Sequence, residues 1–332
     1  MSDIAAKAGV SRTTVSRVLS GNSEKVRISE ETAKKILGIA EKLNFRPDAL
    51  ARGLKLKNTH TIGVIVPDIT NPFFAEIGRS LESFLDKNEY SMILMNSDDN
   101  EVKEKKCIDL LLSKRVDGLV ISPAGYEDEN IALLAKEKVP FVLVDRMVKN
   151  VRCSYVVSDN YNGSKTAVSY LIGLGHKRIG FVGGRVNTSI NRERRQGYLD
   201  TLKENGITPD IELDISIGFN REAGERSMDM LLKVKEPPTA VFVANNFLGI
   251  GVMLSLRKNR VKVPGEMSVI EFDDTDFSRL SDVAVTSITQ DTARIGEKGA
   301  QILLNKIGGN NREEKIVLPV ILAVRESTKK YS

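Results

Sequence analysis

The sequence contains few of the residues from which metal, disulfide and catalytic sites are built. Its 332 residues include two cysteines, Cys107 and Cys153, and two histidines, His60 and His176. Two isolated cysteines exclude a disulfide framework and a Cys-x-x-Cys metal site. Neither histidine has metal-ligand or triad spacing, and no Gly-x-Gly-x-x-Gly or Walker A loop occurs. We therefore expect no cofactor, no metal and no catalytic residues, which argues against an enzyme.

Long hydrophobic runs are also missing. No apolar stretch approaches the ~18–20 residues that a membrane-spanning helix needs. The first residues, MSDIAAKAGV, do not form a charged segment followed by an apolar core and a cleavage site. We therefore expect a cytoplasmic protein that does not enter a membrane.

The overall composition is that of an ordinary globular protein, with 41% hydrophobic and 28% charged residues. The length is about twice the rough 150-residue expectation for one domain, so at least two domains are expected. Residues 1–58 contain 12 Lys and Arg against 6 Asp and Glu, a net charge of +6, whereas the other 274 residues carry a net charge of −1. A basic head on a near-neutral body indicates a nucleic-acid-binding module joined to a second function.

The first twenty residues predict two short helices around a tight corner. Gly9 is suited to end the first helix, and Ser11 to cap a second helix that runs from Arg12 to about Leu19. A third helix is expected after Ser29. This pattern is typical of a DNA-binding helix-turn-helix, although a solvated basic helical bundle would share it.

The second helix would expose a face suited to DNA. Arginine can pair bidentately with guanine, and short hydroxyl side chains can hold phosphates. The candidate DNA-binding residues of this helix and its cap are Ser11, Arg12, Thr13, Thr14, Ser16 and Arg17.

A further short helix is expected at about residues 47–56, where Pro47 fits a first turn and Leu50 and Leu54 share one side. Its length is below the ~12–15 residues needed for marginal stability alone. We therefore predict that it forms only when packed against a partner, such as DNA. The alternative is a linker whose leucines dock on a neighbouring element.

From Thr61 onward, apolar strand-like runs alternate with amphipathic stretches, as in parallel sheets covered on both faces. The expected strands are Thr61–Val66, Ser91–Met95, Gly118–Ile121, Phe141–Val144, Arg178–Val182, Ala240–Val243 and Ser268–Phe272. Ligands of such sheets bind at the carboxyl ends of the strands. The loops that follow these strands are rich in Asp and Asn, together with Arg146 and nearby Phe residues, which is a composition suited to a polyol.

The motifs together resemble the LacI/GalR family of bacterial transcription regulators. The resemblance begins with AAKAGVSRTTVSRVLSGN and ISEETAKKILGIAEKLNFRPDALARGLK, and it continues through TIGVIVPDITNPFFAEI, VPFVLVDR, LGHKRIGFVGG, TAVFVANN, VPGEMSVIEFDD and VRES. The motifs occur in order and cover essentially the whole chain.

For the head, the resemblance implies that Arg12, Thr13 and Arg17 read bases. It also implies that Leu54, with Ala51 beside it, inserts into a central step of the minor groove, as apolar wedges do. The segment SEKVR before Ile28 is longer than usual in the family.

For the body, the resemblance implies two Rossmann-like lobes of the periplasmic-binding-protein type, joined by three crossovers. The head would span 1–58 and the effector-binding and dimerisation domain 59–332, with one lobe at about 60–158 and 290–322 and the other at about 159–289 and 323–332. The implied effector-binding residues are Asn71, Phe73, Phe74, Asp145, Asp159, Arg194, Phe219, Asn245 and Asp273. Phe73 and Phe74 could instead be core residues, Asp145 a loop cap, and another arginine of the same helix could replace Arg194.

Two positions depart from the family pattern. Asn246 stands where an aspartate is usual, and Glu271 replaces a small residue, usually glycine. Both would change the charge in or near the cleft. The sugar that a relative binds therefore does not predict the ligand of this chain.

The resemblance implies a homodimeric repressor that binds a near-palindromic operator and responds to a small molecule, expected to be a sugar or sugar derivative. The chain stops soon after VRES without leucine heptads, so a dimer is expected rather than a tetramer. Control by a phosphorylated carrier protein is the alternative within the family. A solute-binding protein would not explain the basic head and should carry a signal peptide.

Overall fold

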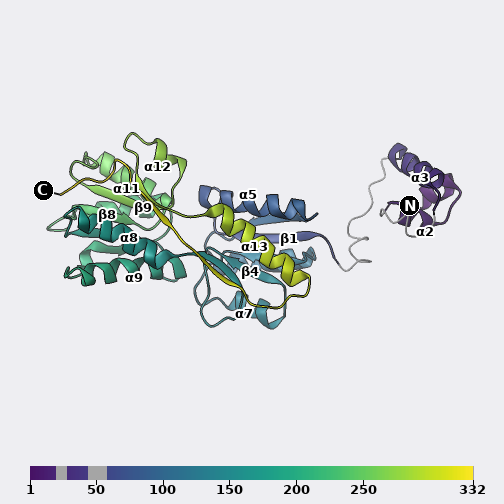
Figure 1. The fold of residues 1–332 in the computed structure, drawn as a ribbon, viewed down its shortest axis with the longest axis horizontal. Coiled ribbons are helices and arrows are strands. Elements are labelled where there is room, and N and C mark those ends of the chain that lie inside the picture. The colour runs from purple at the N-terminus through teal and green to yellow at the C-terminus, as the bar shows by residue number, and fades with distance from the viewer. Residues whose placement is uncertain (20–27, 44–57, 332) are drawn as a thin grey trace. The chain divides into compact units, whose positions relative to one another are not determined.

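A computed structural model describes residues 1–19, 28–43 and 58–331. The chain divides into two compact units, Met1–Thr59 and His60–Ser332, and each is described by itself (Figure 1).

The smaller unit is all-helical in its described part. It consists of α1 (Ser2–Ala8), α2 (Arg12–Leu19) and α3 (Glu30–Lys42). Gly9 ends α1 in the left-handed region, with φ 72°, a conformation that suits a residue without a β-carbon. The side chain of Ser29 caps α3 by accepting a hydrogen bond from the backbone N–H of Thr32. One buried residue from each helix, Ile4, Val15 and Ile36, meets in the small core.

The larger unit contains two sheets, each the centre of one lobe. The sheet of the first lobe has the order β11-β5-β4-β3-β1-β2. All of its strand pairs are parallel. Its strands are β1 (Thr61–Val66), β2 (Ser91–Asn96), β3 (Gly118–Ile121), β4 (Phe141–Val144), β5 (Tyr155–Ser158) and β11 (Lys315–Leu318).

The sheet of the second lobe has the order β12-β10-β9-β8-β6-β7, and only β12 runs antiparallel to its neighbour. Its strands are β6 (Ile179–Gly183), β7 (Asp214–Ser216), β8 (Ala240–Val243), β9 (Ser268–Phe272), β10 (Thr286–Thr289) and β12 (Ile321–Ala323). A short 3-10 helix, η2 (Ile211–Leu213), precedes β7.

Helices cover both sheets (Figure 1). The first lobe contains α5 (Pro72–Lys87), α6 (Glu101–Ser113), α7 (Glu129–Lys136) and α13 (Thr292–Ile307). The second lobe contains α8 (Asn160–Gly173), α9 (Ser189–Glu204), α10 (Arg221–Leu231), α11 (Asn246–Lys258) and α12 (Asp276–Leu280). The central strands are buried on both faces, which explains why their sequences read as continuous apolar runs.

The chain crosses between the lobes three times. It passes from β5 to α8, returns from β10 to α13, and passes again from β11 to β12. The last crossing is visible as the yellow segment that runs from one lobe to the other (Figure 1). A helical head with a body of two parallel α/β lobes confirms the predicted fold class.

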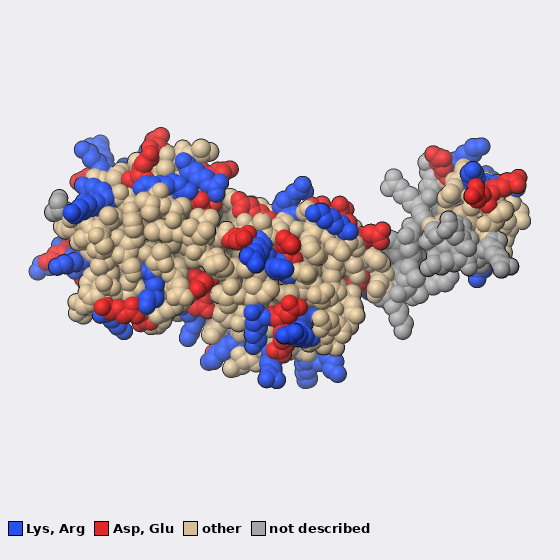
Figure 2. Space-filling model, in the orientation of Figure 1, with Lys and Arg blue, Asp and Glu red and all other residues tan. Residues whose placement is uncertain are grey.

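Charged side chains of both signs occur on the surface of the larger unit. On the face drawn in Figure 2, Lys and Arg side chains are interspersed with Asp and Glu side chains, as expected for a body of near-zero net charge. Among the described residues, no helix is long and apolar enough to cross a membrane.

Candidate functional site

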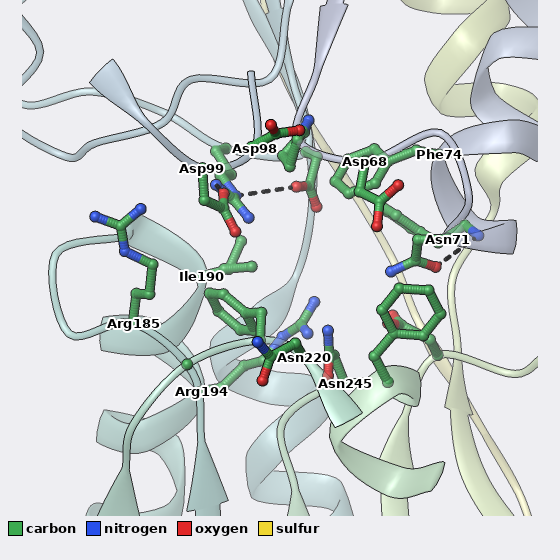
Figure 3. A pocket seen from close by; sticks show the side chains of 18 of the residues that line it. Asp68, Asn71, Phe74, Asp98, Asp99, Arg185, Ile190, Arg194, Asn220 and Asn245 are labelled. Atoms are coloured by element: carbon green, nitrogen blue, oxygen red, sulfur yellow. Dashed lines mark hydrogen bonds and ion pairs between the residues drawn. The ribbon is translucent and has the colours of Figure 1, made fainter. Parts of the chain in front are cut away.

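A cleft of about 480 Å³ lies between the two lobes of the larger unit, at the carboxyl ends of both sets of strands (Figure 3). Of the nine residues expected to bind an effector, eight line it, namely Asn71, Phe73, Phe74, Asp145, Arg194, Phe219, Asn245 and Asp273. Asp159 does not. Its carboxylate caps α8 instead, accepting a hydrogen bond of 3.0 Å from the backbone N–H of Asn162.

Arg194 is the arginine of α9 that reaches the cleft. Its Nε donates to Asn160 Oδ1 at 2.8 Å, Nη1 donates to the carbonyl of Ala244, and the guanidinium lies 3.6 Å from the centroid of the Phe272 ring. The side chain is almost completely buried, and burial lowers its pKa, which the nearby Asp273 and Asp145 partly oppose. These contacts fix the orientation of the guanidinium before any ligand arrives.

The neighbouring arginines of α9 have other partners. Arg195 forms an ion pair with Asp214, and Arg192 stacks on the ring of Tyr126 at 4.9 Å. The structure therefore places Arg194, and neither of these two, in the lining of the cleft.

Each lobe contributes one buried aspartate from the end of a central strand. Asp145 follows β4 and Asp273 follows β9, and both have left-handed backbone conformations, with φ 66° and 78°. Such strained positions concentrate at binding sites. Asp145 accepts a hydrogen bond of 3.2 Å from Ser122 Oγ, whereas Asp273 accepts from Gln290 Nε2 and from the backbone N–H of Asn246.

Burial raises the pKa of both carboxyl groups. The pKa of Asp145 rises to about 6, with Arg146 and Arg194 opposing the shift. Burial likewise raises the pKa of Asp273, with Arg194 again opposing it. The two acids therefore lie in a weakly solvated environment in which hydroxyl donors of a ligand would be strongly attracted.

Helix caps and a glycine position the polar and aromatic side chains that line the cleft. Asn71 caps α5 by accepting from the backbone N–H of Phe73 at 3.1 Å, and Asn245 caps α11 by accepting from that of Leu248 at 2.8 Å. Figure 3 shows the Asn245 amide pointing into the pocket. Gly184 leaves room for an aromatic wall, because a β-carbon there would lie 1.9 Å from the ring of Phe219.

Phe73 and Phe74 have both of the roles considered for them, as lining of the cleft and as core residues. They meet edge to face with ring centroids 5.1 Å apart, and both line the cleft while belonging to the core of the first lobe.

Several lining residues were not named in the sequence-based prediction. They include Asp68, Asp98, Asp99, Arg146, Arg185, Ile190, Asn220, Phe247 and Gln290. Asp68, Asp98 and Arg146 lie in the polar loops that the sequence had singled out. Arg146 forms an ion pair with Asp99 and lies 5.4 Å from the centroid of the Phe219 ring, so it connects a charge pair of the first lobe to an aromatic ring of the second.

The two departures from the family pattern do not line the cleft. Asn246 bonds to Asn71 of the other lobe. Glu271 is completely buried in β9 and accepts a hydrogen bond from Ser278 Oγ of α12. Among the described residues, no cluster of His, Cys, Asp or Glu is arranged to hold a metal ion.

In the smaller unit, α2 exposes the face that was expected to meet DNA. Arg12, Thr13 and Arg17 are exposed, whereas Val15 and Val18 are buried. Ser11 Oγ accepts from the backbone N–H of Thr14 at 3.0 Å and contacts the Thr14 hydroxyl at 2.9 Å, and Ser16 is half-buried beside them. Ala51 and Leu54 lie outside the described residues.

The helical head and the polar inter-lobe cleft define a DNA-binding regulatory protein with a body of the periplasmic-binding-protein type. Comparison with known families agrees. Residues 1–48 match the family described as "Bacterial regulatory proteins, lacI family", and residues 168–328 match the "Periplasmic binding protein-like domain".

Close relatives extend over the whole chain. Catabolite control protein A of Priestia megaterium is 34% identical over 98% of both chains, and the HTH-type transcriptional repressor PurR of Photobacterium profundum is 32% identical over 98% of both. The crystal structure of the lac repressor dimer bound to operator and the anti-inducer ONPF has a TM-score of 0.87 at 27% identity, covering 98% of both chains. The complex of the transcriptional regulator CelR with cellobiose has a TM-score of 0.75 at 28% identity, also over 98% of both.

The chain therefore belongs to the LacI family of bacterial regulatory proteins. It is a DNA-binding transcriptional repressor and, like the proteins of this family, not an enzyme.

Proposed function

We propose that this repressor acts as a cytoplasmic homodimer on a near-palindromic operator and is controlled by an uncharged polyhydroxylated ligand, a sugar or sugar derivative, bound in the inter-lobe cleft. The observation that carries the ligand class is the chemistry of the cleft wall. Carboxylates and amides there can pair with hydroxyl groups, and the faces of Phe rings can pack on C–H groups. The CelR–cellobiose complex shows that a chain of this fold accommodates a sugar.

The charge of the wall favours an uncharged ligand over an anion. Five aspartates face three arginines in the lining, and they are Asp68, Asp98, Asp99, Asp145 and Asp273 against Arg146, Arg185 and Arg194. Arg146 is already paired with Asp99, and Arg194 is engaged by Asn160 and Ala244. A phosphate or carboxylate on the ligand would therefore meet a wall with excess negative charge.

Thermal-shift measurements on the full chain test this assignment. A ligand at 100 times its Kd stabilises the folded state by about 2.7 kcal/mol, so binding raises the unfolding temperature. We would compare, at equal concentrations, neutral sugars, sugar phosphates, sugar acids and nucleobases. We expect stabilisation by a neutral sugar and loss of that shift in Asp273→Ala. Stabilisation only by an anionic sugar or a nucleobase would contradict the proposed class.

We propose that Arg12, Thr13 and Arg17 of each protomer read bases and that Ser11, Thr14 and Ser16 hold phosphates, with Ala51 and Leu54 at the minor groove. Support comes from the exposed face of α2 and from the likeness to the operator-bound lac repressor dimer. Selection from a random duplex library should recover a near-palindrome, bound by two copies of the chain. Leu54→Ala should weaken binding to that operator far more than binding to unrelated DNA, and equal losses on both would contradict the wedge.

A further inference from the structure

Two asparagines form a direct connection between the lobes at one side of the cleft. Asn246 Nδ2 donates to Asn71 Oδ1 at 2.9 Å, and Asn71 Nδ2 donates to Asn246 Oδ1 at 3.2 Å. Asn71 belongs to the first lobe and Asn246 to the second, and both side chains are buried, with 5% and 1% of their surface exposed. Each amide donates to and accepts from the other, so the contact is complete without a ligand.

The pair is anchored in the helices that begin at the cleft. Asn71 Oδ1 also caps α5, and Asn246 Oδ1 also accepts from the backbone N–H of Phe247 in the first turn of α11 at 2.9 Å. The backbone N–H of Asn246 in turn donates to Asp273 at 3.3 Å. Because both amide oxygens keep their acceptor role within their own lobe, separation of the lobes would leave the two Nδ2 donors without partners, at least until water entered.

A second group of inter-lobe contacts lies near Arg185 and Ile190, on the side of the pocket away from Asn71 (Figure 3). There the backbone N–H of Tyr126 donates to the carbonyl of Asn187 at 3.0 Å, and that of Met147 donates to Ser189 Oγ at 3.0 Å. Tyr126 and Met147 belong to the first lobe, and their acceptors to the second. These two amide hydrogens therefore report whether the lobes are closed.

We propose that the Asn71–Asn246 pair is a latch that holds the cleft closed before any ligand binds and thereby sets the affinity of the effector site. This inference rests on the proposed function in that the cleft is taken as the effector site. A ligand that binds only the closed form has an apparent Kd equal to its intrinsic Kd divided by the closed fraction, so breaking the latch weakens effector binding without removing any ligand contact.

The residue type at 246 is decisive for this latch. An aspartate, which is usual in the family, could accept from Asn71 Nδ2 but could not donate to Asn71 Oδ1. Its second interaction would place two acceptor oxygens against each other, which is repulsive. With asparagine at 246, the two lobes can therefore close on each other without a ligand or proton to bridge residues 71 and 246.

Hydrogen exchange of the full-length, ligand-free protein, followed by mass spectrometry, tests the latch. In Asn246→Ala we expect the amides of Tyr126 and Met147, at the opposite side of the cleft, to exchange about tenfold faster, the change that corresponds to the loss of one to two net hydrogen bonds. The matched control is Asn259→Ala, at the C-cap of the same helix. The Asn259 amide donates only within its own lobe, to Asp229 Oδ1 at 3.1 Å and to the carbonyl of Ser255 at 2.9 Å, so the exchange of Tyr126 and Met147 should not change.

A second variant, Asn246→Asp, keeps the shape of the side chain and serves if Asn246→Ala folds poorly, as judged by its unfolding midpoint. It should open the lobes to a similar extent. Faster exchange confined to residues 245–249 in both variants would overturn the latch. That result is distinguishable from failure of the proposed ligand class, because the exchange experiment contains no ligand and the thermal-shift experiment uses the unmodified chain.

Discussion

The carboxylate of Glu271 fills the space in front of Gly249, so that a β-carbon on residue 249 would lie 1.7 Å from Glu271 Oε2. Glu271 is completely buried, its other oxygen accepts from Ser278 Oγ, and Oε2 has no hydrogen-bond partner among the described residues. With Glu271 in place, strand β9 and helix α11 therefore leave no room for a side chain at residue 249. The acid at 271 and the glycine at 249 therefore depend on each other in the packing of the second lobe.

Gly249→Ala should destabilise the protein by about 1–3 kcal/mol, the usual cost of overpacking a core. Glu271→Ala in the same chain should remove most of that cost, because the clashing carboxylate is gone. Urea denaturation of the two single variants and the double variant would measure the coupling. Gly173→Ala in α8, where a β-carbon meets nothing within 4 Å, is the control and should not destabilise. Equal effects at 249 and 173 would refute this packing interpretation.

The stability of the first lobe should depend on pH through Glu104. Burial and the hydrogen-bonded Asp128 carboxyl raise the pKa of Glu104 to about 8 from 4.5. Because the folded-state pKa lies above the unfolded value, the protonated form favours folding, and stability is lost as pH rises from about 4.5 to about 8. Glu104→Gln should flatten this decline by on the order of 2 kcal/mol between pH 5 and pH 8. Urea midpoints across that range would decide, and parallel profiles for the two proteins would count against a raised pKa of Glu104.

Arg194→Lys should abolish the thermal shift caused by the cleft ligand and should also lower stability without ligand by about 1–3 kcal/mol. A lysine keeps the charge but cannot donate to both Asn160 and Ala244 or stack on Phe272 in the same way. Arg195→Lys provides the comparison on the same helix, because Arg195 pairs with Asp214 and does not line the cleft. The ligand response of Arg195→Lys should match that of the unmodified chain, and a comparable loss in both variants would exclude a specific role for Arg194.

On the selected operator, Arg12→Ala should weaken binding by about 1–3 kcal/mol and relax the preference at one base pair, as expected when a base contact is removed. Lys34→Ala, an exposed change on α3, should weaken binding to all duplexes alike and lower the slope of log affinity against log salt by about 1. Fluorescence anisotropy over a salt series separates the two behaviours. If Arg12→Ala also acted uniformly on all sequences, Arg12 would contact phosphate and not a base.

The central strands could be predicted because they are buried on both faces. The bounds expected for Thr61–Val66, Gly118–Ile121, Phe141–Val144, Ala240–Val243 and Ser268–Phe272 agree with β1, β3, β4, β8 and β9. The missed strands are β5, β7, β10, β11 and β12. Strand β5 is buried and apolar like the strands that were predicted. The other four are polar or lie at an edge. Strand β10 reads Thr-Ser-Ile-Thr, β7 has three residues, and β11 and β12 carry the exposed Val317 and Ile321. Such segments lack the continuous apolar run that marks a central strand.

The site was predicted in outline because ligand loops follow parallel strands, which directed attention to Asn71, Asp145, Asn245 and Asp273. Arg185 carries no such signal, and Asn220 and Gln290 lie in loops after β7 and β10, two strands that the sequence did not predict. Asp159 follows a strand as Asp145 and Asp273 do, but it immediately precedes α8, and its carboxylate accepts a hydrogen bond from a backbone N–H group of that helix. Whether such a residue caps a helix or faces a ligand depends on tertiary geometry.

The last crossing between the lobes has a consequence for folding during synthesis. Residues 315–318 supply an edge strand to the first sheet, and residues 321–323 supply one to the second. On the ribosome, where chains emerge from the N-terminus, neither lobe can complete its sheet until nearly the whole described chain has been made. The head, whose helices contact one another within the first 42 residues, has no such requirement. The segment that recognises DNA can therefore fold early during synthesis, while the segment that senses the ligand must wait for its final strands.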